Sequence, residues 1–268
     1  MSDFLKKMAA ASAARAAALT PFSSADFDKP LVKLEPQGFG IIAEIKDRSP
    51  AEGDLATPAS DRSAQAAAYA KGGAAAISVL TEPSRFAGGL EHLEEVVGAV
   101  PGTPVMRKDF LVDPLQVSEA RKAGASGVLL IATMLPDGQL RQMLDRACEH
   151  DLFVLLECFD EEDLGRSSRL LDNNADAERA KSGQLLIGVN TRNLRTLEVD
   201  SDRLQRLAPV LPNAICVAES GLREPSDAGK AAAWGYRMAL VGTALMRSDD
   251  PASLVAAMRE AGNAKAKA

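Results

Sequence analysis

The sequence contains few aromatic residues. Its 268 residues include eight Phe, two Tyr and one Trp, which together make up 4% of the chain. A surface that binds single-stranded nucleic acid needs aromatic side chains among basic ones, so this composition disfavours that class of protein. The core of so long a chain must instead be filled mainly by alanine, leucine and valine.

Histidine and cysteine are equally scarce. The two histidines, His92 and His150, are too few for a His-rich metal site. The three cysteines, Cys148, Cys158 and Cys216, are odd in number, widely spaced and form no CxxC pair. Such cysteines are typical of reduced core residues in a cytosolic protein, so we expect a cytoplasmic location.

Excess positive charge and long apolar runs are absent as well. The chain has 31 Lys and Arg against 37 Asp and Glu, for a net charge of −6. Such a balance disfavours nucleic acid and anionic membranes as partners, so any phosphate must be held by local donors. No apolar run approaches the ~18 residues of a membrane span. The Ala-rich N-terminus is interrupted by charges, which indicates a helix and not a signal peptide.

Eight short apolar runs recur about every 23 to 34 residues. Each is too short for a helix, and nearly continuous hydrophobicity is typical of strands buried on both faces of a parallel sheet. The runs are Gly40–Lys46, Ala75–Leu80, Pro104–Lys108, Gly127–Ile131, Phe153–Glu157, Leu185–Asn190, Ile215–Glu219 and Met238–Gly242. Between them lie stretches with helical spacing, among them Asp61–Lys71, Leu115–Lys122, Asp137–His150, Ser201–Ala208 and Ser226–Trp234.

Eight strands that alternate with helices predict an α/β fold, a (β/α)8 TIM barrel. The second interpretation is an open doubly wound sheet, but no GxGxxG opens its first unit. We expect one barrel domain over residues 1–268. Residues 1–39 would form an N-terminal helical extension, and the tail from about residue 262 to 268 would be frayed.

Polar side chains close several of the predicted strands. In this fold the carboxyl ends of the strands meet at one mouth, where active sites lie. A structural ion pair would explain any one of these charges, but their gathering on one face favours a site. Lysines and glutamates without histidine suggest proton transfer to and from an anionic substrate. The residues are Glu44, Lys46, Lys108, Glu157, Asn190 and Glu219.

Glycine-containing loops follow the last two predicted strands. Ser220-Gly221 and Gly242-Thr243 lie where barrels of this type often hold a phosphate, because glycine lets backbone N–H groups approach an anion. The residues alone therefore predict a barrel enzyme that acts on a phosphorylated small molecule by Lys/Glu acid–base catalysis.

Six ordered motifs resemble the indole-3-glycerol-phosphate synthase family. They are IAEIKDRSPAEG, AISVLTEPSRFAGG, MRKDFLVDPLQVSEARKAGASGVLLI, IGVNTRNL, VAESG and VGTALMR, in register from about residue 40 to 248. The resemblance implies a (β/α)8 barrel with an N-terminal helical extension. It also implies conversion of 1-(2-carboxyphenylamino)-1-deoxyribulose 5-phosphate to indole-3-glycerol phosphate, with release of CO2 and water and without a metal or organic cofactor.

The same resemblance implies roles for the strand-end residues. Lys108 resembles the general acid that protonates the ribulose carbonyl. Lys46 resembles the lysine that holds the substrate carboxylate or phosphate and assists dehydration. Glu157 and Glu44 would transfer protons and position the lysines, while Asn190 and Glu219 would orient the sugar hydroxyls and the reacting chain. The expected substrate- and phosphate-binding residues are Ser49, Phe86, Phe110, Arg192, Ser220, Gly221, Gly242 and Thr243.

The chain departs from the family pattern at several places. The usual SPS is Ser49-Pro50-Ala51 and is followed by Glu52 where a lysine is common. The usual NNR is Asn190-Thr191-Arg192. The segment before the first strand is shorter than typical. Between Asp163 and Gln184 the chain is longer, and its polar run DNNADAERAKSG predicts a solvated surface loop.

Two alternatives remain open from the sequence. One is a related phosphate-binding barrel enzyme, such as a phosphoribosylanthranilate isomerase or a paralogue that closes a different ring. The isomerase would use a Cys/Asp pair, but no cysteine ends the first strand. A non-catalytic barrel subunit would have lost Lys46, Lys108 or Glu157, and none is missing. The expected partner is a phosphorylated small molecule, with no nucleic acid or membrane partner, and the expected state is a monomer or weak homo-oligomer.

Overall fold

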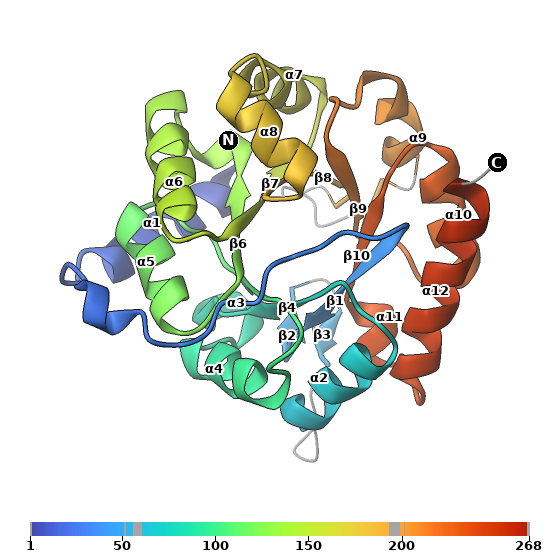
Figure 1. The fold of residues 1–268 in the computed structure, drawn as a ribbon, viewed down its shortest axis with the longest axis horizontal. Coiled ribbons are helices and arrows are strands. Elements are labelled where there is room, and N and C mark those ends of the chain that lie inside the picture. The colour runs from blue at the N-terminus through green and yellow to red at the C-terminus, as the bar shows by residue number, and fades with distance from the viewer. Residues whose placement is uncertain (1, 51, 56–60, 193–198, 201, 267–268) are drawn as a thin grey trace.

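The short apolar runs form the strands of a closed barrel. The computed structural model describes residues 2–50, 52–55, 61–192, 199–200 and 202–266. Eight parallel strands lie side by side, and the last pairs with the first to close the ring (Figure 1). They are β1 (Gly40–Ile45), β4 (Ala76–Leu80), β5 (Val105–Lys108), β6 (Gly127–Ile131), β7 (Phe153–Cys158), β8 (Leu185–Asn190), β9 (Ile215–Glu219) and β10 (Met238–Val241). The predicted (β/α)8 barrel is confirmed.

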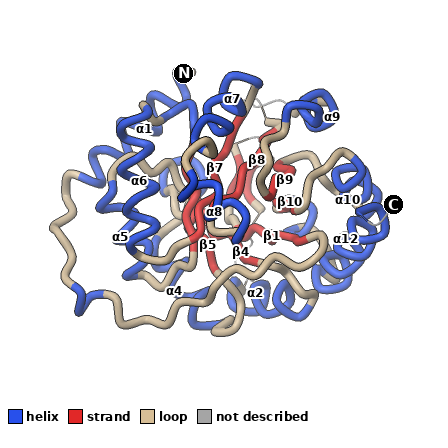
Figure 2. The backbone as a smooth tube through the Cα atoms, turned by 45° about the horizontal axis from the view of Figure 1, so that its top comes forward, coloured by secondary structure: helices blue, strands red, loops and turns tan. Residues whose placement is uncertain are grey.

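Helices surround the barrel and cover its outer face (Figure 2). Their apolar sides and the outward strand residues exclude water together, which explains why strand residues are buried on both faces. The α-helices are α1 (Asp3–Ala16), α2 (Arg62–Lys71), α3 (Pro83–Phe86), α4 (Leu90–Ala99), α5 (Pro114–Lys122), α6 (Asp137–Glu149), α7 (Glu161–Leu170), α8 (Asn174–Ser182), α9 (Arg203–Leu207), α10 (Pro225–Ala233), α11 (Thr243–Met246) and α12 (Pro251–Ala266). Short 3-10 helices are η1 (Ser24–Asp26), η2 (Ala132–Met134) and η3 (Ala208–Val210).

The N-terminal extension contributes one long helix. Helix α1 lies on the outside of the barrel beside α5 and α6 (Figure 1). Ser2 caps its first turn by accepting a hydrogen bond from the Leu5 amide, and Leu5, Met8 and Ala16 are buried. Beyond η1, no further helix precedes β1 in the described part of the extension.

The loop after β1 forms a small hairpin that the sequence did not predict. Strands β2 (Arg48–Ser49) and β3 (Gly53–Asp54) pair antiparallel. Gly53 has a φ of +73°, which favours glycine, and the Arg48 guanidinium contacts the Asp54 carboxylate at 2.6 Å. The hairpin holds Ser49 near the barrel mouth, while Ala51 lies outside the described residues.

The C-terminal tail is ordered as a helix up to Ala266, so the expectation of fraying from about residue 262 was wrong for residues 262–266. Residues 267 and 268 lie outside the described part. The Asn263 side chain accepts a hydrogen bond from the Phe39 amide at 2.8 Å. A Cβ on Gly262 would come within 2.3 Å of the Phe39 ring, so close packing against this ring holds the tail in place.

The polar run at 172–183 is also not a loop, and that expectation was wrong. It forms α8, which is capped by the Asn173 side chain. The Asp176 carboxylate is buried and binds the guanidinium groups of Arg141 and Arg179. Three paired charges therefore hold a highly polar helix on the barrel, which composition alone does not indicate.

This buried carboxylate gives a stability prediction. Asp176→Ala is expected to lower the free energy of unfolding by about 2 to 3 kcal/mol, because two partly buried arginines lose their partner. The matched control is Glu178→Ala in the same helix, whose exposed pair with Lys181 is worth about 0.5 kcal/mol or less. Urea denaturation measures the free energy of unfolding of both variants. Equal losses of stability would contradict the role of Asp176 in holding α8 on the barrel.

Candidate active site

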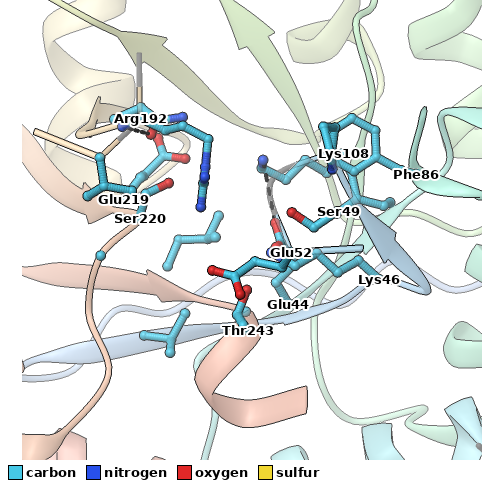
Figure 3. A pocket seen from close by; sticks show the side chains of 18 of the residues that line it. Glu44, Lys46, Ser49, Glu52, Phe86, Lys108, Arg192, Glu219, Ser220 and Thr243 are labelled. Atoms are coloured by element: carbon cyan, nitrogen blue, oxygen red, sulfur yellow. Dashed lines mark hydrogen bonds and ion pairs between the residues drawn. The ribbon is translucent and has the colours of Figure 1, made fainter. Parts of the chain in front are cut away.

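The carboxyl ends of the strands surround one large cavity of about 390 Å³. All fourteen residues expected from the sequence line it, and Figure 3 shows ten of its lining side chains with labels. They come from the ends of β1, β5, β7, β8 and β9 and from the loops that follow β1, β4, β5, β8, β9 and β10. The fold therefore brings together residues that lie up to 199 positions apart, from Glu44 to Thr243.

At the floor of the cavity, Glu44 joins two lysines. Glu44 and Lys46 are two residues apart and point to the same side, with Lys46 Nζ at 2.6 Å from Glu44 Oε1. Lys108 Nζ lies 3.4 Å from the other oxygen, Oε2 (Figure 3). Burial raises the pKa of the Glu44 carboxyl, but the two ammonium groups outweigh burial and lower that pKa to about 2. Glu44 is therefore an anion that holds both lysines in place.

Lys108 is surrounded by carboxylates. Burial by itself lowers the pKa of its ammonium group, but Glu44, Glu157 and Glu219 together raise that pKa above its usual range. The ammonium group therefore stays protonated at neutral pH. Because it faces the cavity, it can donate a proton or a hydrogen bond to an oxygen bound there.

Glu219 is buried without a hydrogen-bond partner for either carboxylate oxygen among the described residues. Burial and the neighbouring Glu157 carboxylate raise the pKa of Glu219 well above its usual range. Gly188, on the strand between them, leaves the necessary space, since a Cβ there would lie 1.9 Å from Glu219 Oε1. The site thus contains two adjacent carboxyl groups, and the environment of Glu219 favours its neutral form.

The loops after β9 and β10 line another side of the cavity and form the candidate phosphate cradle, defined by Ser220, Gly221, Gly242 and Thr243. Ser220 and Gly221 have φ values of +66° and +78°, so the chain turns sharply directly after β9. A Cβ at Gly242 would come within 2.8 Å of Lys46 Nζ, so a larger residue here would displace the Glu44–Lys46 ion pair. Helix α11 begins at Thr243 and has only four residues, so its free N–H groups matter more than a helix dipole.

Aromatic rings line another side of the cavity. Phe86 and Phe110 lie with ring centroids 6.2 Å apart. The sequence missed a third ring, Phe4 of α1, which meets Phe110 edge-on at 5.8 Å. A single phenylalanine in an Ala-rich helix gives no signal of its own, because its place depends on how α1 docks. Together the rings can hold a planar aryl group.

The departures from the family pattern have clear structural consequences. Glu52 lines the cavity and pairs with Arg247 at 3.1 Å, so its negative charge is partly neutralised at the mouth. The Thr191 hydroxyl donates a hydrogen bond to the Glu219 backbone carbonyl at 3.2 Å and thereby fixes the end of β9. The Arg192 amide donates to the Asn190 side chain at 2.8 Å, and its own side chain lines the cavity.

The cavity also contains residues that the sequence did not single out as site residues. Besides Phe4 and Glu52, they are Pro50, Leu80, Asp109, Leu129, Ile131, Val199, Leu222, Arg223, Leu240, Val241, Ala244 and Arg247. Most are apolar strand and loop residues that no chemical pattern distinguishes from the core. Across the described ranges, no three His, Cys, Asp or Glu side chains form a group that could hold a metal ion. None of the described helices combines the length and apolarity needed to cross a membrane.

Comparison with known proteins gives one consistent family. A family model described as indole-3-glycerol phosphate synthase matches residues 5–258. A protein of that name from a Nocardioides species is 45% identical over 230 residues, which cover 85% of this chain and 83% of that protein. Another from Mycobacterium leprae is 44% identical over 252 residues, which cover 93% and 85%.

A comparison of structures identifies the same kind of barrel. The crystal structure of 3-hexulose-6-phosphate synthase from Salmonella typhimurium superimposes with a TM-score of 0.63. The match covers 85% of this chain and all of that one, at 16% sequence identity. At that identity the likeness supports the fold alone.

Proposed function

The chain belongs to the indole-3-glycerol phosphate synthase family of carboxy-lyases in tryptophan biosynthesis, and from this membership we propose how its residues perform the reaction. The substrate is 1-(2-carboxyphenylamino)-1-deoxyribulose 5-phosphate. The observation that carries the assignment is the position of the Lys108 ammonium group, which lies among three carboxyl groups in the cavity. Aromatic rings line one side of this cavity, and the candidate phosphate cradle lines another.

Binding would orient the substrate between the two sides of the cavity. The phosphate would accept hydrogen bonds from the cradle, and the carboxyphenyl ring would lie among Phe4, Phe86 and Phe110. Such orientation brings the ring carbon that bears the carboxylate close to the ribulose carbonyl, which supplies a large part of the rate enhancement.

Ring closure requires a proton for the carbonyl oxygen. As the ring carbon attacks, the C=O π electrons move to oxygen, and Lys108 donates a proton there so that a neutral hydroxyl group forms. The ring, having given two π electrons to the new C–C bond, is left as an iminium-like cation. Loss of CO2 returns the electrons of the C–C bond to that cation and restores the aromatic ring.

Dehydration completes the reaction. Lys46 would protonate the departing hydroxyl group, which leaves as water. Glu157 would accept the final proton as the indole double bond forms. Glu44 would hold both lysines in position, and Asn190 and Glu219 would orient the sugar chain. The overall balance is one CO2 and one water for each indole formed.

A direct assay tests this function. Purified protein mixed with the substrate is expected to produce indole-3-glycerol phosphate, followed by its fluorescence, with equal release of CO2. Turnover of a phosphoribosylanthranilate instead would favour the isomerase alternative, although Lys46 and not a cysteine lies beyond the end of β1. Absence of fluorescence at micromolar enzyme would contradict the assignment.

We further propose a cytoplasmic location and a monomer or weak homo-oligomer. All three cysteines are free thiols, and Cys158 and Cys216 are buried, as in proteins of a reducing compartment. We also propose that the barrel and its extension form one domain, because α1 buries apolar residues against the barrel. Size measurement in solution and unfolding in one cooperative transition test the last two proposals.

The charge at the mouth gives a prediction about affinity. Glu52→Gln is expected to lower KM by about two- to fourfold with kcat unchanged, because the substrate is an anion and the pair with Arg247 is exposed to water. The matched control is Asp54→Asn, a carboxylate of the same hairpin that pairs with Arg48 outside the cavity lining.

Salt provides the second readout for Glu52. Raising the ionic strength to about 0.5 M should reduce the difference in KM between Glu52→Gln and the unaltered protein, because mobile ions screen charges at the cavity mouth. An unchanged or higher KM for Glu52→Gln in low salt would contradict this account.

A further inference from the structure

The end of β5 carries three consecutive charged residues, Arg107, Lys108 and Asp109. Lys108 points into the cavity, whereas its two chain neighbours, Arg107 and Asp109, form an ion pair with each other, and the carboxylate of Asp109 is fully buried. This carboxylate accepts hydrogen bonds from Thr81 Oγ1 at 2.9 Å, Arg107 Nη2 at 3.2 Å and the Phe110 amide at 2.8 Å. These three donors belong to the barrel itself.

A fourth donor comes from the N-terminal extension. Arg15 Nη2, in the last turn of α1, lies 2.6 Å from Asp109 Oδ1. It is the shortest of the four contacts, and it joins segments that are 94 residues apart. Two guanidinium groups, one from the barrel and one from α1, therefore hold the residue that directly follows Lys108.

A second link fixes the same loop to the same helix. The Gln116 amide nitrogen donates to the Ser12 hydroxyl at 2.9 Å and to the Ser12 carbonyl at 3.2 Å. The Gln116 amide oxygen accepts from the Val112 backbone amide at 2.9 Å. Both links hold the chain between Asp109 and Gln116, which includes Phe110 of the aromatic side.

We propose that Arg15 is a positioning residue for the catalytic end of β5. By binding Asp109 it holds the backbone from which Lys108 and Phe110 project, so the docking of α1 is coupled to the geometry of the proton donor. The activity readout of this inference rests on the proposed function. A displacement of about 1 Å at a reacting group can cost roughly 100-fold in rate, so a small shift of this backbone is measurable.

Three variants test the role. Arg15→Ala is expected to lower kcat by about 10- to 30-fold with less than about a threefold change in KM. Arg15→Lys, which keeps the charge, should recover most of the loss. The matched control is Lys122→Ala, because Lys122 also holds the extension, through Asp26 and Phe22, but lies on the protein surface in the last turn of α5 and makes no contact with Asp109. Its kcat should stay within about twofold of the unaltered protein.

Amide hydrogen exchange provides a readout that does not depend on activity. In Arg15→Ala the Phe110 and Val112 amides should exchange faster than in the unaltered protein and in Lys122→Ala, whereas affinity for inorganic phosphate should stay the same. An unchanged kcat and unchanged exchange would overturn the proposal. So would a rise in KM alone, which would indicate a helix that only covers the aryl group. If the unaltered protein has no turnover, the proposed function fails, and the exchange data alone decide whether Arg15 positions this loop.

Discussion

Lys108→Ala is expected to lower kcat by roughly three to four orders of magnitude while the protein stays folded. The variant removes the proton donor for the ribulose carbonyl. It also removes the ion pair with Glu44 Oε2, for which Lys108 is the only partner among the described residues. Glu44 keeps its ion pair with Lys46 at 2.6 Å, so this buried carboxylate still has a counter-ion in the variant. Steady-state fluorescence of the indole product gives kcat, and thermal unfolding checks the fold.

The matched control for Lys108→Ala is Lys71→Ala, which removes an exposed lysine at the end of α2 and should leave kcat unchanged. Small primary ammonium ions added to Lys108→Ala should restore part of the rate, because they can enter the space left by the side chain. Turnover near that of the unaltered protein, with the fold intact, would show that Lys108 is not the proton donor.

The two adjacent carboxyl groups should respond differently to the same substitution. Glu157→Gln is expected to lower kcat by about 100- to 1,000-fold, because the group that accepts the final proton is lost. Glu219→Gln should cost about tenfold or less, because burial and Glu157 raise the pKa of Glu219 and so favour its neutral form, which an amide resembles. Equal losses for the two variants would contradict this division of roles.

The pH dependence of the rate follows from the raised pKa of Glu219. A carboxyl group with a raised pKa loses its proton at a higher pH than an ordinary carboxyl group does, and a second negative charge then appears beside Glu157. The rate of the unaltered protein should therefore fall on the alkaline side. Glu219→Gln cannot lose this proton, and its alkaline limb should shift to higher pH or disappear. If the rate falls at the same alkaline pH in both proteins, a group other than Glu219 causes the fall.

Local sequence was sufficient to predict the barrel and its mouth. The strands are nearly continuous apolar runs of four to six residues, a pattern that only burial on both faces explains. A charged residue at the end of such a run is costly to bury without a function, and for that reason Glu44, Lys108 and Glu157 could be singled out. Their gathering in one cavity needed only the rule that parallel strand ends in a barrel share one face.

The features that the sequence did not predict depend on contacts between distant segments. Phe4 reaches the cavity because α1 docks beside α5, and the pair of Glu52 with Arg247 joins residues 195 positions apart. Helix α8 is polar, and it forms because Asp176 meets Arg141 of another helix. The tail stays helical because Asn263 binds the Phe39 amide. None of these partners can be recognised from the composition of its own segment.

The Arg15 link illustrates the same limit for catalysis. Sequence patterns identified the lysine in RKDF, but they gave no reason to connect it with an arginine in the N-terminal helix. The connection depends on Asp109, whose buried carboxylate directly follows Lys108 in the chain and accepts a hydrogen bond from Arg15 of α1. Residues that position a catalytic group can therefore lie in a segment that contributes no chemistry.

The most direct test of this account is a crystal structure with a substrate analogue whose carbonyl has been reduced to an alcohol. We predict that its phosphate lies on Ser220, Gly221, Gly242 and Thr243, with its aryl ring among the three phenylalanines. The new hydroxyl oxygen should then lie within about 3 Å of Lys108 Nζ. An analogue bound in the opposite direction, or a hydroxyl oxygen beyond hydrogen-bond reach of Lys108, would contradict the proposed mechanism.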